Sequence, residues 1–269
     1  MLRRAAGYLA DRGCDAPRLD AEILLADVLG VDRLTLYTDH DRPLSAGETD
    51  AYRAAIARRG VREPVAYITG RRGFRRLELT VTPSVLVPRP ETELLVEWVL
   101  EVAHHGARVL DWGTGSGALA LAVADERPDL HVTGIDRSPD ALAVARANDP
   151  DGGVTWVESD GFAALSGERF DVIAANPPYL SQADLVAAPP ELGFEPAGAL
   201  VAGPTGLEAL ESIARDAPTH LAPLGWLVAE VGIGQAERVG GLLRDAGLVD
   251  VGCRRDLSGI ERAVGGRLA

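Results

Sequence analysis

The stretch from Arg108 to Gly117, Arg-Val-Leu-Asp-Trp-Gly-Thr-Gly-Ser-Gly, most constrains what this chain can fold into. It joins a short apolar strand to an acidic residue, a glycine-rich turn and the start of a helix near Ala118. This order is typical of the β-α-β units that build a parallel sheet covered by helices. Four later apolar segments continue the alternation, at residues 131–135, 154–157, 172–175 and 225–231. The sequence therefore predicts an α/β, Rossmann-like domain.

The glycine-rich turn favours a particular kind of ligand. Glycines let a ligand lie against the backbone without a Cβ clash, although a lone Gly-x-Gly-x-Gly is weak evidence for a dinucleotide site. Asp111 would bring negative charge to the place where a pyrophosphate would bind, which suits a cationic amino-acid tail better. S-adenosylmethionine carries such a tail and a sulfonium, so the turn favours this cofactor.

Two acidic residues follow the next strands of the expected sheet. Asp136 lies about 20 positions beyond the glycine turn, where Rossmann-like folds hydrogen-bond a ribose diol. A helix cap at Ser138 explains the residues that follow but not Asp136 itself. Asp160 lies where an adenine amino group could be held, and a simple polar turn is a serious alternative there.

The segment Phe170–Leu180 carries the second motif, because an apolar strand there runs directly into Asn-Pro-Pro-Tyr. In open α/β sheets, ligands bind beyond the carboxyl ends of such strands. The Asn176 oxygen and the Pro177 carbonyl could each accept one hydrogen of a planar amino group, while the Tyr179 ring covers its flat face. A bare Asn-Pro dipeptide would be read as a turn, but four such residues after a buried strand favour a site.

Composition narrows the class of protein. The chain has 269 residues, 46% hydrophobic and 25% charged, as in a globular protein. Its net charge of −13 is a poor match to a nucleic-acid backbone and accommodates a protein substrate more easily. Cys14 and Cys253 have no metal-like spacing, the histidines form no ligand pattern, and no segment is long enough to cross a bilayer. We expect a cytoplasmic protein with reduced thiols, no metal and no membrane attachment.

Three regions are expected along the chain. Residues 1–70 show apolar positions at helical spacing and should form a small helical domain. Residues 71–84 alternate apolar and polar side chains, which predicts a β-hairpin linker, and residues 85–269 form the catalytic domain. The arginine pairs at 58–59, 71–72 and 75–76 form a basic strip, interpreted as a solvated face rather than a docking surface. Thr92 is expected to cap a helix that begins near it, in a loop that either only starts this helix or also walls the cofactor pocket.

The motifs together resemble a class I S-adenosylmethionine-dependent methyltransferase of the amino-nitrogen type. Several other stretches resemble the PrmC/HemK family across nearly the whole length, namely residues 17–25, 64–70, 87–93, 194–196 and 255–260. That family methylates the side-chain amide nitrogen (N5) of the glutamine in the Gly-Gly-Gln loop of peptide chain release factors, with S-adenosylhomocysteine as product. The resemblance implies a role in translation termination, with the helical domain recognising the substrate.

The resemblance also assigns residues. It implies cofactor binding by Gly113, Thr114, Gly115, Ser116, Gly117, Asp136, Asp160, Gly161 and Asn176, and glutamine binding and catalysis by Asn176, Pro177, Pro178 and Tyr179. The chain departs from the family at two places. Gly73 replaces the usual Glu before Phe74, and Gly161 replaces the usual Trp after Asp160, so that Phe162 or a neighbour would have to supply the adenine-side contact.

Two other functions fit parts of the pattern. A nucleic-acid adenine-N6 methyltransferase needs the same grip on an amino group and a flipped base stacked on Tyr179. The acidic net charge and the absence of an evident basic recognition domain argue against it. A cofactor-binding module with vestigial transfer needs no amide clamp, so the intact Asn-Pro-Pro-Tyr argues against that interpretation.

Overall fold

Seven strands form the main sheet of the computed structural model, which describes residues 1–269. Across the sheet they are β10 (Leu248–Arg255), β11 (Glu261–Leu268), β9 (Leu221–Glu230), β6 (Phe170–Ala175), β3 (Arg108–Trp112), β4 (His131–Asp136) and β5 (Thr155–Glu158). The neighbours from β9 to β5 pair in parallel, while β11 is antiparallel to both β9 and β10. The predicted Rossmann-like α/β sheet is confirmed.

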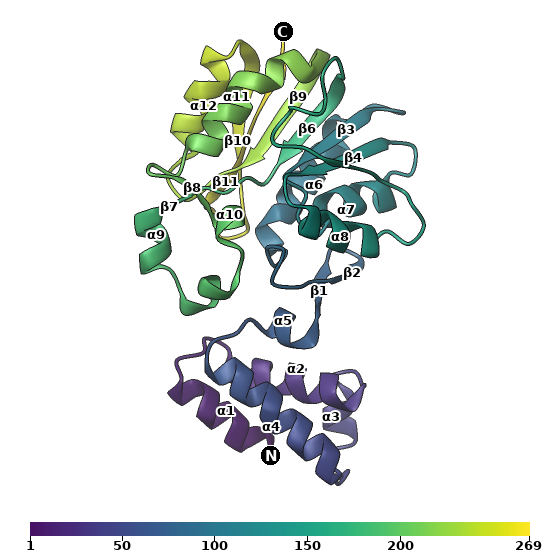
Figure 1. Cartoon of the computed structure of the whole chain (residues 1–269), viewed down its shortest axis with the longest axis vertical. Helices are drawn as coiled ribbons and strands as arrows, with labels where there is room; N and C mark the ends of the chain where they lie inside the picture. Colours follow the sequence, from purple (N-terminus) through teal and green to yellow (C-terminus); the bar gives the residue numbers. More distant parts are fainter. The chain divides into compact units, whose positions relative to one another are not determined.

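Helices cover both faces of this sheet (Figure 1). One face carries α6 (Glu93–Val102), α7 (Ala118–Glu126) and α8 (Pro139–Ala147), and the other carries α11 (Glu208–His220) and α12 (Ala236–Asp245). Side chains of β6 alternate between the two hydrophobic cores: Val172 belongs to the core with α6 and α7, and Ile173 to the core with α11 and α12. A strand buried on both faces has the apolar composition that the sequence shows.

The chain divides into two compact units, and the first contains residues 1–71 together with Pro189–Phe194. Its hydrophobic core includes the fully buried Leu9, Leu24 and Tyr52. The helices of this unit are α1 (Leu2–Asp11), α2 (Pro17–Leu29), α3 (Thr35–Thr38), α4 (Ala46–Gly60), α5 (Val65–Thr69) and the 3-10 helix η2 (Pro190–Phe194). The helical character predicted for this part of the sequence is present. None of the helices in the chain combines the length and apolar character needed to cross a bilayer.

Buried charges hold η2 within this first unit. Arg59 is only 6% exposed, and its guanidinium donates to Asp20 at 2.7 Å and to Glu191 at 2.9 Å. Arg62 donates two further hydrogen bonds to Glu191, at 2.6 and 2.7 Å. Charge-assisted bonds of this kind tie a segment distant in sequence to the helices of residues 1–71.

The arginine pairs are solvated only in part: Arg58, Arg71 and Arg76 are exposed, whereas Arg59 is buried and Arg72 and Arg75 are half-buried. β1 (Arg71–Phe74) and β2 (Leu77–Thr80) form a two-stranded sheet, joined by a turn at Arg75 and Arg76. Their arginines have acidic partners: Arg75 bonds Glu126 and Glu97, and Arg76 pairs with Asp125. Further up the chain, Arg58 pairs with Glu63, Arg59 with Asp20 and Glu191, and Arg71 with Asp27. Intramolecular pairing therefore neutralises five of these six positive charges, while the Arg72 guanidinium donates to the Pro88 carbonyl.

The proline-rich segment after β6 contains short regular elements rather than one irregular loop. These are β7 (Leu180–Ser181), α9 (Gln182–Ala187), η2, α10 (Ala197–Leu200) and β8 (Val201–Gly203). β7 and β8 pair in parallel. Ser181 caps α9 through its hydroxyl, which accepts from the Asp184 amide. The chain that follows the Asn-Pro-Pro-Tyr motif therefore has a defined backbone conformation.

Candidate active site

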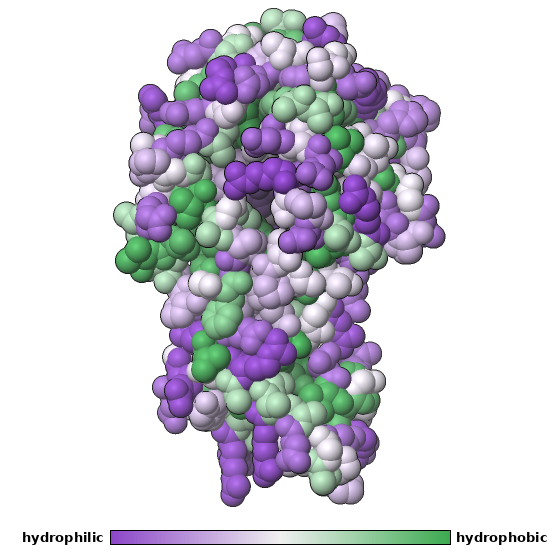
Figure 2. All heavy atoms as spheres, viewed as in Figure 1, coloured by the Kyte–Doolittle hydropathy of each residue, from purple (hydrophilic) through white to green (hydrophobic).

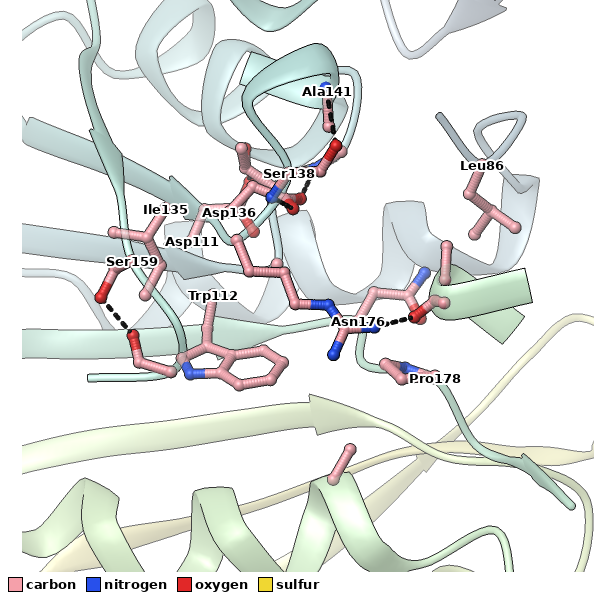
Figure 3. A pocket seen from close by; sticks show the side chains of 18 of the residues that line it. Leu86, Asp111, Trp112, Ile135, Asp136, Ser138, Ala141, Ser159, Asn176 and Pro178 are labelled. Atoms are coloured by element: carbon pink, nitrogen blue, oxygen red, sulfur yellow. Dashed lines mark hydrogen bonds between the residues drawn. The ribbon is translucent and has the colours of Figure 1, made fainter. Parts of the chain in front are cut away.

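Four parallel strands end at one cavity of about 920 Å³ in the second unit. Residues at the carboxyl ends of β3, β4, β5 and β6 line it, as expected of ligand sites in open α/β sheets. Figure 2 shows a hollow rimmed by hydrophilic residues, and Figure 3 shows Asp111, Trp112, Asp136 and Asn176 around the same space. Both motifs found in the sequence therefore meet at one site.

The glycine turn after β3 is held by a buried carboxyl group. Asp111 is 2% exposed, and its Oδ2 accepts from the Thr114 hydroxyl at 2.6 Å and from the Ala120 amide at 3.2 Å. Burial raises the pKa of Asp111 to about 7. Gly113 and Gly115 both have positive φ, 74° and 55°, and a Cβ at either would meet no atom within 4 Å. The turn thus presents bare backbone to open space.

Of the five turn residues, Gly113, Thr114, Gly115 and Ser116 line the cavity, and Gly117 does not. Gly117 has a φ of 83°, and a Cβ there would come within 2.9 Å of the Trp156 ring. This glycine lets α7 begin close against β5.

Asp136 ties the glycine turn to the start of α8. Its Oδ2 accepts from the Gly115 amide at 2.9 Å, and its Oδ1 accepts from the Ser138 amide at 2.9 Å. The Ser138 hydroxyl in turn caps α8 by accepting from the Ala141 amide. A carboxylate has about four lone-pair positions, so two remain on Asp136 for a ligand.

Asp160 and Gly161 line the cavity after β5. Gly161 has a φ of 58° and open space around its Cβ position, and its carbonyl accepts from the Ser159 hydroxyl at 2.8 Å. Two aromatic residues line the cavity with it. The Phe162 ring stacks on His220 with centroids 4.6 Å apart. The Trp112 ring lies in the cavity wall, with its Nε1 buried and without a hydrogen-bond partner.

Trp112 is a lining residue that the sequence reasoning missed. The alternation of side chains along a strand could have indicated its position, because Asp111 and Trp112 must point to opposite faces of β3. Asp111 binds the start of α7, whereas Trp112 packs with the core of α11 and α12.

Asn176 follows β6 and lines the cavity together with Pro178. Pro177 is buried, and Pro177 and Tyr179 lie outside the cavity lining. The Tyr179 hydroxyl donates to Glu230 at 3.4 Å, and burial raises the pKa of Tyr179. The structure therefore brings Asn176 and Pro178 of this motif to the cavity, whereas Glu230 holds Tyr179 outside the cavity lining.

Thr92 occupies the N-cap position of α6, but its side chain does not cap the helix, contrary to the sequence prediction. The 3-10 helix η1 (Pro90–Thr92) leads into α6, and no side-chain cap bond forms at Thr92. Its hydroxyl instead donates to Glu230 Oε2 at 2.6 Å and accepts from Asn176 Nδ2 at 2.9 Å. The loop also lines the cavity, through Leu86, Pro88 and Arg89 among others, so it both starts the helix and forms a wall.

Two further acidic residues act behind this wall. Glu195, only 7% exposed, accepts from the Val87 amide at 3.0 Å and from Arg89 at 2.5 Å. It thereby joins the Phe-Glu-Pro stretch to the loop before α6. Glu230 ends β9 and is 2% exposed, and burial raises its pKa to about 7. A lone carboxylate in an otherwise apolar strand was the sequence signal for Glu230.

Comparison with known proteins agrees with this geometry. The family model of the PrmC N-terminal domain matches residues 1–70, and that of the methyltransferase small domain matches residues 90–189. The release factor glutamine methyltransferase of Geobacter sulfurreducens is 46% identical over 97% of this chain and 93% of its own length. The chain belongs to the release factor glutamine methyltransferase family.

Other members and a more distant structure fit the same assignment. The family member from Burkholderia pseudomallei is 49% identical over 93% of this chain and 92% of its own length. Among solved structures, the hMettl16 catalytic domain in complex with a MAT2A 3'UTR hairpin superposes with a TM-score of 0.63. It covers 80% of this chain and 81% of its own at 17% identity, so this likeness establishes the methyltransferase fold.

Proposed function

We propose that this chain transfers the methyl group of S-adenosylmethionine to N5 of the glutamine side chain in the Gly-Gly-Gln motif of peptide chain release factors. Membership of the glutamine methyltransferase family supports this reaction. The observation that carries it for this chain is the position of Asn176, which lines the same cavity as the glycine turn. An amide-binding side chain and a cofactor-binding turn therefore share one space.

The cavity fits S-adenosylmethionine. The open backbone at Gly113 and Gly115 leaves room for a ligand, and two free acceptor positions on Asp136 suit a ribose diol. When bound, the cofactor supplies an electrophilic methyl group on a sulfonium, and S-adenosylhomocysteine is left after transfer. The cofactor-binding residues in this proposal are Gly113, Thr114, Gly115, Ser116, Asp136, Asp160, Gly161 and Asn176, while Gly117, which does not line the cavity, lets α7 begin close against β5.

The Asn-Pro-Pro-Tyr segment would hold and orient the glutamine. An amide nitrogen is a poor nucleophile, because its lone pair is delocalised into the carbonyl. Hydrogen bonds from its two N–H groups to the Asn176 and Pro177 oxygens raise electron density on the nitrogen and fix its direction. Pro178 stiffens the segment, and Tyr179 fixes the end of the motif through its bond to Glu230. The nitrogen gains the methyl group and loses one proton to solvent, without a dedicated general base.

The remaining parts of the proposal concern the rest of the chain. Residues 1–70 form the region that recognises the release factor, residues 71–84 link it, and residues 85–269 catalyse the transfer. A release factor is the partner, in the cytoplasm, and neither a metal nor a membrane takes part. Adenine-N6 methylation of nucleic acid is the second candidate, but the net charge of −13 works against binding a polyanion.

Labelled S-adenosylmethionine tests the proposal directly. The chain is incubated with a release factor, with the same factor carrying Gln→Ala in its Gly-Gly-Gln motif, or with DNA. We expect label on the unchanged factor only. Label on DNA, or equal label on the Gln→Ala factor, contradicts the proposal.

A further inference from the structure

The side-chain nitrogen of Asn176 is engaged by Thr92, which lines the cavity with it. Its Nδ2 donates to Thr92 Oγ1 at 2.9 Å, and Figure 3 marks this bond beside the label of Asn176. Thr92 Oγ1 also lies 2.6 Å from Glu230 Oε2. Thr92 and Glu230 are 5% and 2% exposed, so solvent does not compete for these bonds.

The donor and acceptor properties of the three groups fix the direction of this chain of bonds. An ionised carboxylate has only acceptors, and a threonine hydroxyl has one hydrogen to give. Thr92 must therefore donate its hydrogen to Glu230, which leaves only lone pairs to face Asn176. The Asn176 amide can therefore bond Thr92 Oγ1 only by donating from its NH2 group. Its Oδ1 is consequently turned away from Thr92 and is free to accept.

This direction matters if Asn176 binds the glutamine, which is the part of the proposed function on which the inference rests. A glutamine –NH2 group presents two hydrogens. A reversed Asn176 would meet them with its own NH2, so that two donors would face each other and no bond would form.

We propose that Thr92 and Glu230 are positioning residues that act through Asn176, holding its side-chain oxygen toward the glutamine amide. The Tyr179 hydroxyl, which donates to the second oxygen of Glu230 at 3.4 Å, links the other end of the motif to the same carboxylate. One buried group thus sets the orientation of the first and last residues of Asn-Pro-Pro-Tyr.

The electrostatics of Glu230 agree with a functional rather than a stabilising role. Burial is the main cause that raises its pKa to about 7 and Glu91 adds to the rise, while the hydrogen bonds from Thr92 and Tyr179 and the charge of Arg262 oppose it. A buried carboxylate without a close cation is costly, and an apolar residue would fill this place at lower cost. Above pH 7 the carboxylate is ionised and the direction of the bonds is fixed.

The test compares variants of the full chain at pH 8 by methyl transfer to a release factor, normalised to the number of cofactor-binding sites. Thr92→Val removes the hydroxyl at nearly constant shape, and Thr92→Ser keeps it. We expect kcat to fall about 10- to 100-fold in Thr92→Val, with cofactor affinity unchanged. Thr92→Ser should stay within about threefold of the unchanged protein, as a retained hydroxyl requires.

Glu230→Met provides the second measurement, because it removes the acceptor together with the buried charge. We expect a similar loss of kcat in a protein that is no less stable to heat, a combination that a purely structural role does not produce. Unchanged kcat in Thr92→Val or in Glu230→Met overturns the inference while the proposed function stands. Absence of transfer by the unchanged protein overturns the proposed function instead.

Discussion

The two loops that meet at the cavity are held in different ways. The partners that fix the glycine turn are nearer in sequence: Thr114 bonds Asp111 three residues away, and Gly115 bonds Asp136 at a separation of 21. The Asn-Pro-Pro-Tyr loop is fixed by distant ones. Asn176 bonds Thr92 across 84 residues, and the Tyr179 carbonyl accepts from Gln235 across 56.

This difference means that the two loops depend on different parts of the fold. The glycine turn belongs to one β-α-β unit, so its shape follows once β3 and β4 pair. The Asn-Pro-Pro-Tyr loop acquires its shape only when α6, β6 and β9 have packed together. We call the glycine turn with Asp136 the cofactor side, and the Asn-Pro-Pro-Tyr loop with its distant partners the glutamine side. Substitutions on one side should therefore leave the other largely unaffected.

Asn176→Ala should give the largest effect and should act mainly on the glutamine side. Loss of the accepting oxygen is expected to lower methyl transfer about 100- to 1000-fold. Cofactor binding, measured by calorimetry, should remain measurable and fall far less than transfer, because the bonds of the glycine turn remain. Asn148→Ala is the matched control, since Asn148 bonds the Ser116 carbonyl on the cofactor side. The separation of the two sides fails if both variants weaken cofactor binding equally.

Glu230→Gln should change stability in a pH-dependent way. With a folded pKa of about 7 against an ordinary 4.5, native Glu230 keeps a proton that the unfolded chain has released between these values. Its contribution to stability therefore falls as pH rises from 4.5 to 7 and is constant above 7. Glu230→Gln should gain up to about 3 kcal/mol relative to the unchanged protein across that window.

Urea unfolding of both proteins at several pH values measures this difference. The buried Asp111 has the same sign of shift, but it is present in both proteins and cancels. A constant difference between pH 4.5 and 7 is incompatible with a raised pKa at Glu230.

Asp136→Ala should act on the cofactor side. It removes the acceptor of the Gly115 and Ser138 amides and frees the glycine turn from α8. We expect cofactor affinity to fall about tenfold, from roughly 1–2 kcal/mol of lost hydrogen bonding. At saturating cofactor, kcat should be close to that of the unchanged protein. A loss confined to kcat, with cofactor affinity unchanged, would contradict the assignment of Asp136 to the cofactor side.

Gln235→Ala should give the smallest effect, on the glutamine side. The Gln235 amide donates to the carbonyls of Tyr179 and Gly206, at 3.0 and 3.3 Å. Its loss should lower kcat about fivefold through a looser motif, with cofactor affinity unchanged. Gln182→Ala, at an exposed position of α9, serves as control and should leave kcat unchanged. Equal kcat values for the two variants would show that Gln235 does not support the loop.

The sequence was sufficient wherever the shape depends on local pattern. The apolar run before Asn176 predicted a strand buried on both faces, and the glycines predicted the turn after β3. It was insufficient where a side chain had a choice of partners. Thr92 looked like a helix cap, but Glu230 competes for its hydroxyl from a strand that begins more than a hundred residues later. Arg59 and Arg75 looked solvated because their acidic partners, Asp20, Glu191 and Glu126, are distant in sequence.

The assignment of Pro189–Phe194 to the first unit has a consequence for dissection of the chain. The polypeptide passes between the units at residues 71/72, 188/189 and 194/195, so no single cut separates them. Removal of residues 1–71 would leave Glu191 without Arg59 and Arg62, in the middle of the segment that follows the Asn-Pro-Pro-Tyr motif. Each unit thus has its own hydrophobic core, but neither is encoded by one contiguous stretch of the gene. Recombination that exchanges residues 1–71 alone would transfer the first unit without its segment Pro189–Phe194.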